Sequence, residues 1–190
     1  MTLRVLRHSP RDFGPNMDQD GWVPVSQLVA VLANYGIDPI SIPIAKFMRP
    51  LEQRVQLRAV MVRASYGHSC PEYQPGPPSI PDQPLFHGTT SECWPMIELF
   101  GLQPVRRRFV QLTTDVHYTT QIAHALESTP IVLQISTATA IEENAEFFAT
   151  DTHVWLASHV PSVFLQFRHA SAPETDTQSN DLDYDDRMAP

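Results

Sequence analysis

The sequence predicts a mixed α+β protein with two lobes, and three local patterns carry that prediction. Between Ser26 and Gly36 apolar residues recur at a helical spacing, which predicts an amphipathic helix. Residues 55–61 alternate between apolar and polar side chains, as a β-strand does. Residues 71–84 hold six prolines, a density that disfavours regular structure and predicts a linker between the lobes.

The elements before the linker form a small lobe, which we place at residues 1–70. Ser26 is the expected N-cap of its helix, and Gly36 the expected stop. The apolar face of that helix consists of Leu28, Val29, Val31, Leu32 and Tyr35. Helix and strand are separated by a segment that contains Pro39, Pro43 and Pro50. The first lobe is therefore expected to be mainly helical and to end in one strand.

The elements after the linker form a second lobe, which we place at residues 85–168. A helix is expected from Ser91 to Gly101, and a shorter one after Asp115. Strands are expected at 109–113, 131–135, 153–156 and 163–167. A compact, largely strand-built lobe follows from this alternation.

Charge is distributed unevenly along a chain whose formal net charge is -8. Residues 1–70 hold eight Arg or Lys against five Asp or Glu, a balance of +3. Residues 71–168 hold four against ten, and residues 169–190 hold one against six. A phosphate-bearing partner is therefore expected at the first lobe. The acidic segment 169–190 has few large apolar residues and is expected to be disordered.

No motif in the sequence indicates a membrane-spanning segment or a metal site. The apolar runs are far shorter than the roughly 20 residues that span a bilayer. The amino-terminal residues lack the apolar core of a secretion signal, so a cytoplasmic location is expected. Cys70 and Cys93 are too few for a disulfide framework and lack metal-ligand spacing, so no metal site is expected.

Three clusters gather groups suited to anion binding or proton transfer. They are Arg7-His8, the segment Arg63 to Ser69, and His87-Gly88-Thr89. Arginine offers a planar fork for phosphate, histidine can exchange protons near neutral pH, and glycine permits close approach to the backbone. Each cluster alone is more often a solvated surface or a structural turn. Their order along the chain is more informative than any one of them.

That order resembles the NAD-dependent RNA 2′-phosphotransferases, whose bacterial members are called KptA. The resemblance covers residues 3 to about 167. The family pattern is Leu-Arg-His, Asp-x-x-Gly-Trp-Val before an apolar helix, Arg-Ala, Gly-His-Ser, His-Gly-Thr, Gly-Leu, an arginine and Val-Trp-Leu. The matching segments here are Leu6-Arg7-His8, Asp18 to Val23, Arg63-Ala64, Gly67-His68-Ser69, His87-Gly88-Thr89, Gly101-Leu102, Arg107 and Val154-Trp155-Leu156.

The resemblance implies an N-terminal winged-helix-like lobe joined to a C-terminal ADP-ribosyltransferase-like lobe, with the reaction in the cleft between them. It implies NAD as co-substrate and RNA bearing a 2′-phosphate, left by tRNA splicing, as partner. The products would be RNA with a free 2′-hydroxyl, nicotinamide and ADP-ribose 1″,2″-cyclic phosphate.

The resemblance also implies residue roles. The catalytic positions, which engage the reacting phosphate, are Arg7, His8 and Arg63. The turn beside that phosphate is formed by His68 and Ser69. The positions expected to bind NAD are His87, Gly88, Thr89, Arg107 and Gln111.

The sequence departs from the family pattern at three places. Two family histidines are replaced by Phe109 and Gln111, and the glutamine before Gly-His-Ser is replaced by Tyr66. Residues 122–129, where the family has a further catalytic arginine, contain none, although His124 lies there. Two alternatives therefore stay open. The chain could be a divergent ADP-ribosyltransferase acting on a terminal nucleic-acid phosphate or a protein, or a non-catalytic domain that binds NAD or phosphorylated RNA. The physiological acceptor and the oligomeric state do not follow from these motifs.

Overall fold

A computed structural model describes residues 1–8, 10–37, 54–126, 129–150 and 152–168. The chain splits into two compact units. The first unit is Met1–Gly76 with Thr150–Thr152, and the second is Pro77–Ala149 with His153–Pro190. The expectations for the proline-punctuated segment and for the acidic segment 169–190 lie outside the described residues.

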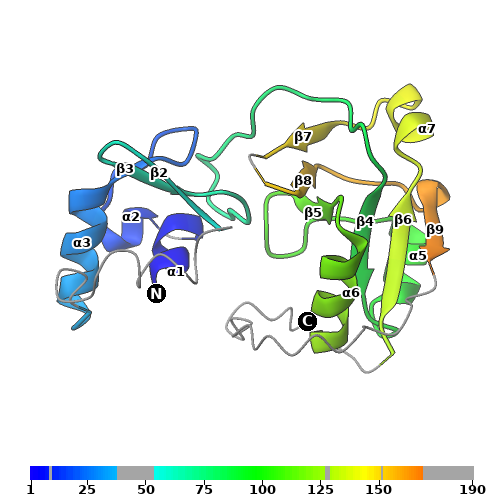
Figure 1. Cartoon of the computed structure of the whole chain (residues 1–190), viewed down its shortest axis with the longest axis horizontal. Helices are drawn as coiled ribbons and strands as arrows, with labels where there is room; N and C mark the ends of the chain where they lie inside the picture. The colour runs from blue at the N-terminus through cyan, green and yellow to red at the C-terminus, as the bar shows by residue number, and fades with distance from the viewer. Residues whose placement is uncertain (9, 38–53, 127–128, 151, 169–190) are drawn as a thin grey trace. The chain divides into compact units, whose positions relative to one another are not determined.

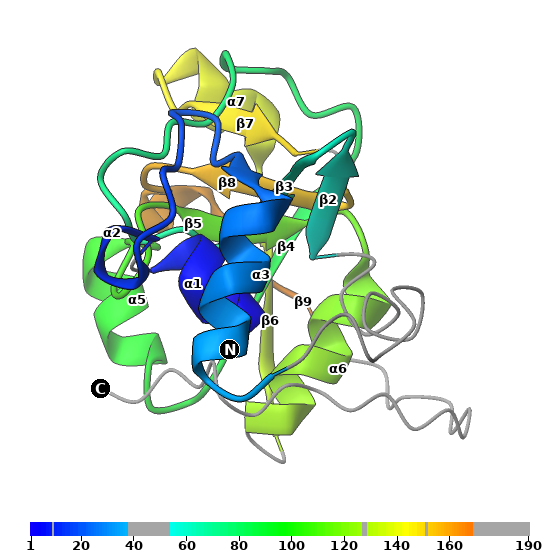
Figure 2. The same cartoon turned by 90° about the vertical axis from the view of Figure 1, so that its left-hand side faces the viewer.

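The first unit combines short helices with a small antiparallel sheet. In chain order its elements are α1 (Thr2–Arg7), α2 (Pro10–Phe13), β1 (Val23–Pro24), α3 (Val25–Asn34), β2 (Val55–Arg58) and β3 (Met61–Ala64). The strand order is β1-β3-β2. Helices α1 and α3 bury apolar side chains against one face of this sheet (Figures 1 and 2). The buried side chains are Leu3, Val5, Leu6, Val23, Leu28, Val31, Leu32, Val55, Val62 and Ala64.

The helix predicted from Ser26 is confirmed as α3, which begins one residue earlier, at Val25. The prediction of a single strand over 55–61 is wrong, because the chain turns back at Ala59 and Val60 to form the β2–β3 hairpin. Ala59 has a φ of 50° in the left-handed region, which reverses the chain. The backbone N–H of Val25 donates to the carbonyl of Val60, which ties the turn to the start of α3.

The second unit is built around one six-stranded antiparallel sheet. In chain order its elements are β4 (Leu85–Thr89), α5 (Trp94–Phe100), β5 (Val110–Thr113), α6 (Val116–Leu126), β6 (Ile131–Ile135), α7 (Thr137–Glu142), β7 (Phe147–Ala149), β8 (Val154–Ala157), the 3-10 turn η2 (Ser162–Phe164) and β9 (Leu165–Arg168). The strand order is β7-β8-β5-β4-β6-β9. Helices accompany two antiparallel sheets, so the mixed helix-and-strand character of the predicted α+β class is confirmed.

The six-stranded sheet is covered on both faces. Helix α6 lies along β4 on one face (Figure 1). The other face carries the buried apolar cluster, to which the strands contribute Leu85, Leu112, Leu133 and other side chains. Strand β4 lies between β5 and β6, in the middle of the sheet.

Several local predictions for the second unit are confirmed. Strand β6 has the predicted bounds, and α6 begins after Asp115, whose carboxylate accepts the backbone N–H of Tyr118. Helix α5 begins later than predicted, at Trp94 rather than after Ser91. Over the described residues, every helix falls short of the length and apolar character that crossing a membrane requires.

Candidate functional site

A tight loop at Asp18–Trp22 organises the polar residues of the first unit. One carboxylate oxygen of Asp18 accepts the backbone N–H groups of Asp20 and Trp22, at 3.0 and 2.8 Å. Gly21 has a φ of +84°, which side-chain-bearing residues rarely adopt. The Asp-x-x-Gly-Trp pattern is thus a turn closed by its own aspartate.

Arg63 is held in a fixed orientation by this loop and by the neighbouring strand. Its Nε donates to Oε1 of Gln56, 2.6 Å away on β2, and its Nη1 donates to the carbonyl of Asp20 at 3.1 Å. The guanidinium carbon lies 4.6 Å from the centre of the Trp22 ring. Cation–π stacking and two hydrogen bonds therefore fix the plane of a guanidinium that is half-buried on β3.

The carboxyl end of α1 lies against the loop that carries Ser69. The backbone N–H of Ser69 donates to the carbonyl of Arg7 at 2.9 Å. Nδ1 of His8 and Oγ of Ser69 share a hydrogen bond, also at 2.9 Å. The side chain of Arg7 is buried, with its guanidinium carbon 5.1 Å from the centre of the Tyr66 ring. Two separate segments thus bring an arginine, a histidine and a serine together.

His68 connects these two groups. Its ring is 2% exposed and stacks on the ring of Tyr73, with centroids 3.7 Å apart. A Cβ placed on Gly21 would lie 3.0 Å from Nε2 of His68, so only glycine at this point leaves room for the imidazole. The loop that orients Arg63 therefore also contacts the Gly-His-Ser segment.

The structure therefore brings the predicted residues of the first unit into one contiguous cluster. We call it the phosphate-site cluster, after the role that the sequence predicts for these residues. Its members are Arg7, His8, Arg63, His68 and Ser69. The cluster combines two permanent cations with two imidazoles and a hydroxyl. These groups can neutralise a phosphate and exchange protons with it.

A second cluster lies on β4 of the second unit. His87, Gly88 and Thr89 were expected in a turn, but they are the last three residues of that strand. Nδ1 of His87 lies 3.0 Å from the backbone carbonyl of Gln111, so Nδ1 carries the proton and donates it. Nε2 of the neutral ring is then a hydrogen-bond acceptor. Burial lowers the pKa of His87 below its ordinary value of 6.5, and the hydrogen bond to Gln111 opposes this shift more weakly.

The contact from His87 to Gln111 occurs where β4 and β5 stop pairing. Strand β4 pairs with β6 over five residues but with β5 at only one register position, Phe86 with Thr113. Beyond Phe86 the imidazole of His87, in place of a backbone N–H of β4, donates to the carbonyl of Gln111. The histidine thus lies where the ladder between the two strands ends.

Gly88 and Thr89 have separate local roles. A Cβ on Gly88 would lie 2.9 Å from Cβ of Ala123 and 3.0 Å from the carbonyl of Thr119, both on α6. Gly88 therefore allows the helix to pack closely on the strand. Thr89 is buried at 3% exposure, and it shares its face of β4 with His87.

The remaining predicted cofactor residues lie apart from the imidazole. Gln111 contacts His87 through its backbone carbonyl. Its side chain shares a face of the sheet with Thr113 and Phe86, opposite to His87. Arg107 is half-buried in the loop before β5, between two exposed arginines.

Sequence reasoning missed the residues that hold the phosphate-site cluster in place. Gln56 and Tyr73 belong to no motif, and their contacts with Arg63 and His68 depend on the tertiary fold. Trp22 is half-buried beneath the guanidinium of Arg63. A sequence feature that could have indicated the contact between Trp22 and Arg63 is the position of Trp22 directly after the Asp-x-x-Gly turn.

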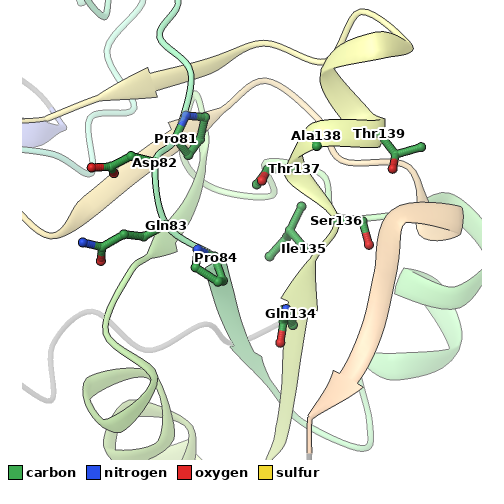
Figure 3. Close-up of a pocket in the computed structure, with 10 residues that line it drawn as sticks. All are labelled: Pro81, Asp82, Gln83, Pro84, Gln134, Ile135, Ser136, Thr137, Ala138 and Thr139. Atoms are coloured by element: carbon green, nitrogen blue, oxygen red, sulfur yellow. The ribbon is translucent and has the colours of Figure 1, made fainter.

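In the described part of the chain no group of three or more His, Cys, Asp or Glu side chains could hold a metal ion. A shallow depression of about 330 Å³ lies between segment 81–84 and the end of β6 (Figure 3). None of the predicted site residues lines it.

Residues 122–129, where the resemblance implies a further arginine, begin within α6. His124 lies in the last turn of that helix and is half-buried. Residues 127 and 128 lie outside the described residues.

Comparison with known proteins gives a consistent result. The family model described as RNA 2′-phosphotransferase, Tpt1 / KptA family matches residues 2–159. A probable RNA 2′-phosphotransferase of Rhizobium rhizogenes is 35% identical over 162 residues, covering 85% of this chain and 87% of that protein. One from Bacillus thuringiensis subsp. konkukian is 32% identical over 167 residues, covering 85% and 89%. The probable RNA 2′-phosphotransferase 1 of Archaeoglobus fulgidus is 32% identical over 164 residues, covering 85% and 76%.

Proposed function

Since the chain belongs to the RNA 2′-phosphotransferase, Tpt1 / KptA family, we propose that it is an enzyme that removes a 2′-phosphate from RNA. The observation that carries the proposal is the extent of the family match, residues 2–159, which includes every residue of both clusters. In this proposal NAD accepts the phosphate, and the RNA is a tRNA or a similar spliced RNA.

The proposed reaction has two steps. In the first, an oxygen of the RNA 2′-phosphate forms a bond to the anomeric ribose carbon of NAD, and the bond to nicotinamide breaks. The leaving nicotinamide takes the bonding electron pair. In the second, the neighbouring ribose hydroxyl attacks the phosphorus and the bond to the RNA 2′-oxygen breaks. The hydroxyl proton ends on that oxygen, giving free RNA and ADP-ribose 1″,2″-cyclic phosphate.

The phosphate-site cluster supplies what the RNA side of this reaction needs. In the proposal the guanidinium groups of Arg63 and Arg7 neutralise the phosphate while it approaches a second anionic substrate. His8, linked to Ser69, moves the proton in the second step. The fixed plane of Arg63 supports this role, because a preoriented guanidinium needs little reorganisation when the phosphate arrives.

The position of His87, where β4 and β5 stop pairing, supports a role for this residue toward NAD. With Nδ1 committed to the Gln111 carbonyl, Nε2 of the neutral ring is left to accept a hydrogen bond from a ribose hydroxyl. Thr89, on the same face, adds a hydroxyl. We assign Gly88 to the same site because it lets α6 pack on β4. We assign Gln111 to it because its backbone carbonyl orients His87. Arg107 is assigned to bind the dinucleotide phosphates.

The proposal extends to the architecture. We assign residues 1–70 to a winged-helix-like lobe that binds RNA, in which α1, α2 and α3 accompany the β2–β3 hairpin as the wing. Residues 71–84 are the linker, and residues 85–168 form an ADP-ribosyltransferase-like lobe.

The experiment that tests the proposal is incubation of the protein with NAD and a short RNA carrying one internal 2′-phosphate. Mass analysis of RNA and dinucleotide products reads the outcome. Dephosphorylated RNA together with ADP-ribose cyclic phosphate supports the full reaction. Accumulated ADP-ribosylated RNA would mean that the second step is impaired, either at Gln111 or by the missing family arginine. Unchanged RNA contradicts the proposal and favours another acceptor or a binding role.

A further inference from the structure

We propose that the outward face of the β1–β3–β2 sheet carries the RNA backbone past the phosphate site, with Arg58 and Arg54 contacting phosphates that flank the reacting nucleotide. The inference rests on the proposed function, because it takes Arg63 as a ligand of the reacting phosphate. It adds residues on both sides of Arg63 and a chemical class for what they bind, single-stranded RNA.

The register of the hairpin defines which side chains share this face. Gln56 pairs with Arg63 and Arg58 pairs with Met61, so all four project from the same face of the sheet. The contact between the Gln56 and Arg63 side chains confirms the assignment. Arg54, two residues before Gln56, follows the same alternation. The opposite face carries the buried Val55, Val62 and Ala64 of the core.

The face is cationic along its length. Strands β2 and β3 contain no acidic residue, and Arg58 is exposed at the end of β2. Arg54 is half-buried at the other end. The contact between Arg63 and Asp20 is to the backbone carbonyl of Asp20. A polyanion is the partner that this charge complements.

The spacing suits successive charges on an extended strand. A β-strand rises about 3.3 Å per residue, so Arg58 and Arg54 lie on the order of 7 Å along β2 on either side of Gln56, the residue opposite Arg63. The three arginines thus form a row with the proposed phosphate ligand in the middle. RNA held there would have its flanking phosphates over Arg58 and Arg54.

Backbone hydrogen bonds hold the β2–β3 hairpin in place at both ends. The backbone N–H of Val25 donates to the carbonyl of Val60 at 2.8 Å, and that of Ser65 donates to the carbonyl of Arg54 at 2.9 Å. Both ends of the row are therefore attached to the rest of the unit. A preordered row of cations loses less entropy on binding than flexible side chains on a loop.

The test compares two RNA substrates, each with one 2′-phosphate: a ten-nucleotide strand and the minimal dinucleotide. For Arg58→Ala we expect KM for the ten-nucleotide RNA to rise about fivefold to tenfold at 50 mM salt with kcat unchanged. The dependence of log KM on log salt should weaken by about 0.7. KM for the dinucleotide should stay as in the wild type. Arg58→Lys should retain the salt dependence, because it keeps the charge.

The matched control is Arg4→Ala, which removes an exposed cation from α1 of the same unit. It should leave KM for both substrates unchanged. An equal rise in KM for both substrates in Arg58→Ala, no rise for either, or the same rise in Arg4→Ala would overturn the inference while leaving the proposed function intact. Failure of the wild-type protein to turn over either substrate would overturn both.

Discussion

The protonation state of His87 affects the stability of the fold. Its pKa is lowered by burial, and its ring donates to the Gln111 carbonyl. In the unfolded chain the same imidazole titrates at about 6.5. Between pH 6.5 and the lowered folded value the unfolded state therefore binds more protons than the folded state. By linkage, the free energy of unfolding falls as the pH drops through that window.

We expect His87→Asn to reduce this acid sensitivity. The asparagine amide can still donate toward the Gln111 carbonyl but does not titrate. Urea unfolding at pH 7.5 and at pH 5.0 should show a smaller loss of unfolding free energy in the variant than in the wild type. The control is His117→Asn on the exposed surface of α6, which should behave as the wild type does. An identical pH dependence in His87→Asn and the wild type would contradict the assignment.

Tyr66 occupies a place where the family pattern has glutamine, and in this chain its ring lies under Arg7. Both residues are buried, at 6% and 4% exposure. Cation–π interactions strengthen when the cation is removed from water, reaching about 2 kcal/mol. The aromatic ring therefore positions the Arg7 guanidinium, with no hydrogen bond to the phosphate needed from Tyr66 itself.

Loss of the ring should show in turnover more than in RNA binding. We expect Tyr66→Leu to lower kcat about tenfold with little change in KM for RNA, since a misplaced guanidinium costs transition-state stabilisation. Tyr66→Phe should keep near-wild-type kcat, because the ring face is retained. Steady-state kinetics with the 2′-phosphorylated RNA measures both constants. Equal losses in the two variants would mean that the hydroxyl, and not the ring, matters.

At the scale of elements, the packing of α6 on β4 depends on the absence of one side chain. A methyl group on Gly88 would overlap Ala123 and the carbonyl of Thr119. Both are fixed parts of the helix, so the clash cannot be relieved by a rotamer change. We expect Gly88→Ala to lower the free energy of unfolding by about 1–3 kcal/mol.

Urea unfolding measures this cost directly, and the chain provides a matched control. Gly76→Ala adds the same methyl group where nothing lies within 4 Å, and its effect should be close to zero. If Gly88→Ala were as stable as the wild type, α6 would have to move away from β4 at little cost.

Elements whose signal is local could be predicted from the sequence. Helix α3 and strand β6 were predicted because each carries its full apolar period within one segment. Apolar and polar residues keep alternating through the turn at Ala59, so the pattern predicts one strand where the structure has the β2–β3 hairpin. Helix α1 was missed because its six residues are too few to display a period.

The candidate site likewise has a part that could be predicted from the sequence and a part that could not. The clusters around Arg7, Arg63 and His87 were found by motif, since their residues are adjacent in the sequence. The contacts that orient them were not, because Gln56 reaches Arg63 across a hairpin and Gln111 reaches His87 from the next strand. The expected turn at residues 87–89 proved to be a strand, since the neighbours that pair with it are distant in the sequence.

At the scale of the whole molecule, the charge opposes the proposed substrate. The formal net charge is -8, although residues 1–70 carry a balance of +3. The segment 169–190 contributes six acidic residues against one arginine, so its balance is -5 and the rest of the chain holds -3. A polyanion approaching at low salt is repelled by the sum of these charges as well as attracted by the local arginines.

We expect neutralisation of the acidic segment to favour RNA binding at low salt only. Replacing the four aspartates Asp181, Asp183, Asp185 and Asp186 with asparagine changes the net charge from -8 to -4. KM for the ten-nucleotide RNA should fall about twofold at 50 mM salt. At 0.5 M salt, where the Debye length is about 4 Å, wild type and variant should coincide. The same four positions changed to glutamate keep the charge and should match the wild type. An effect that persists at 0.5 M salt, or that glutamate also produces, would point to direct contact by the segment rather than to long-range repulsion.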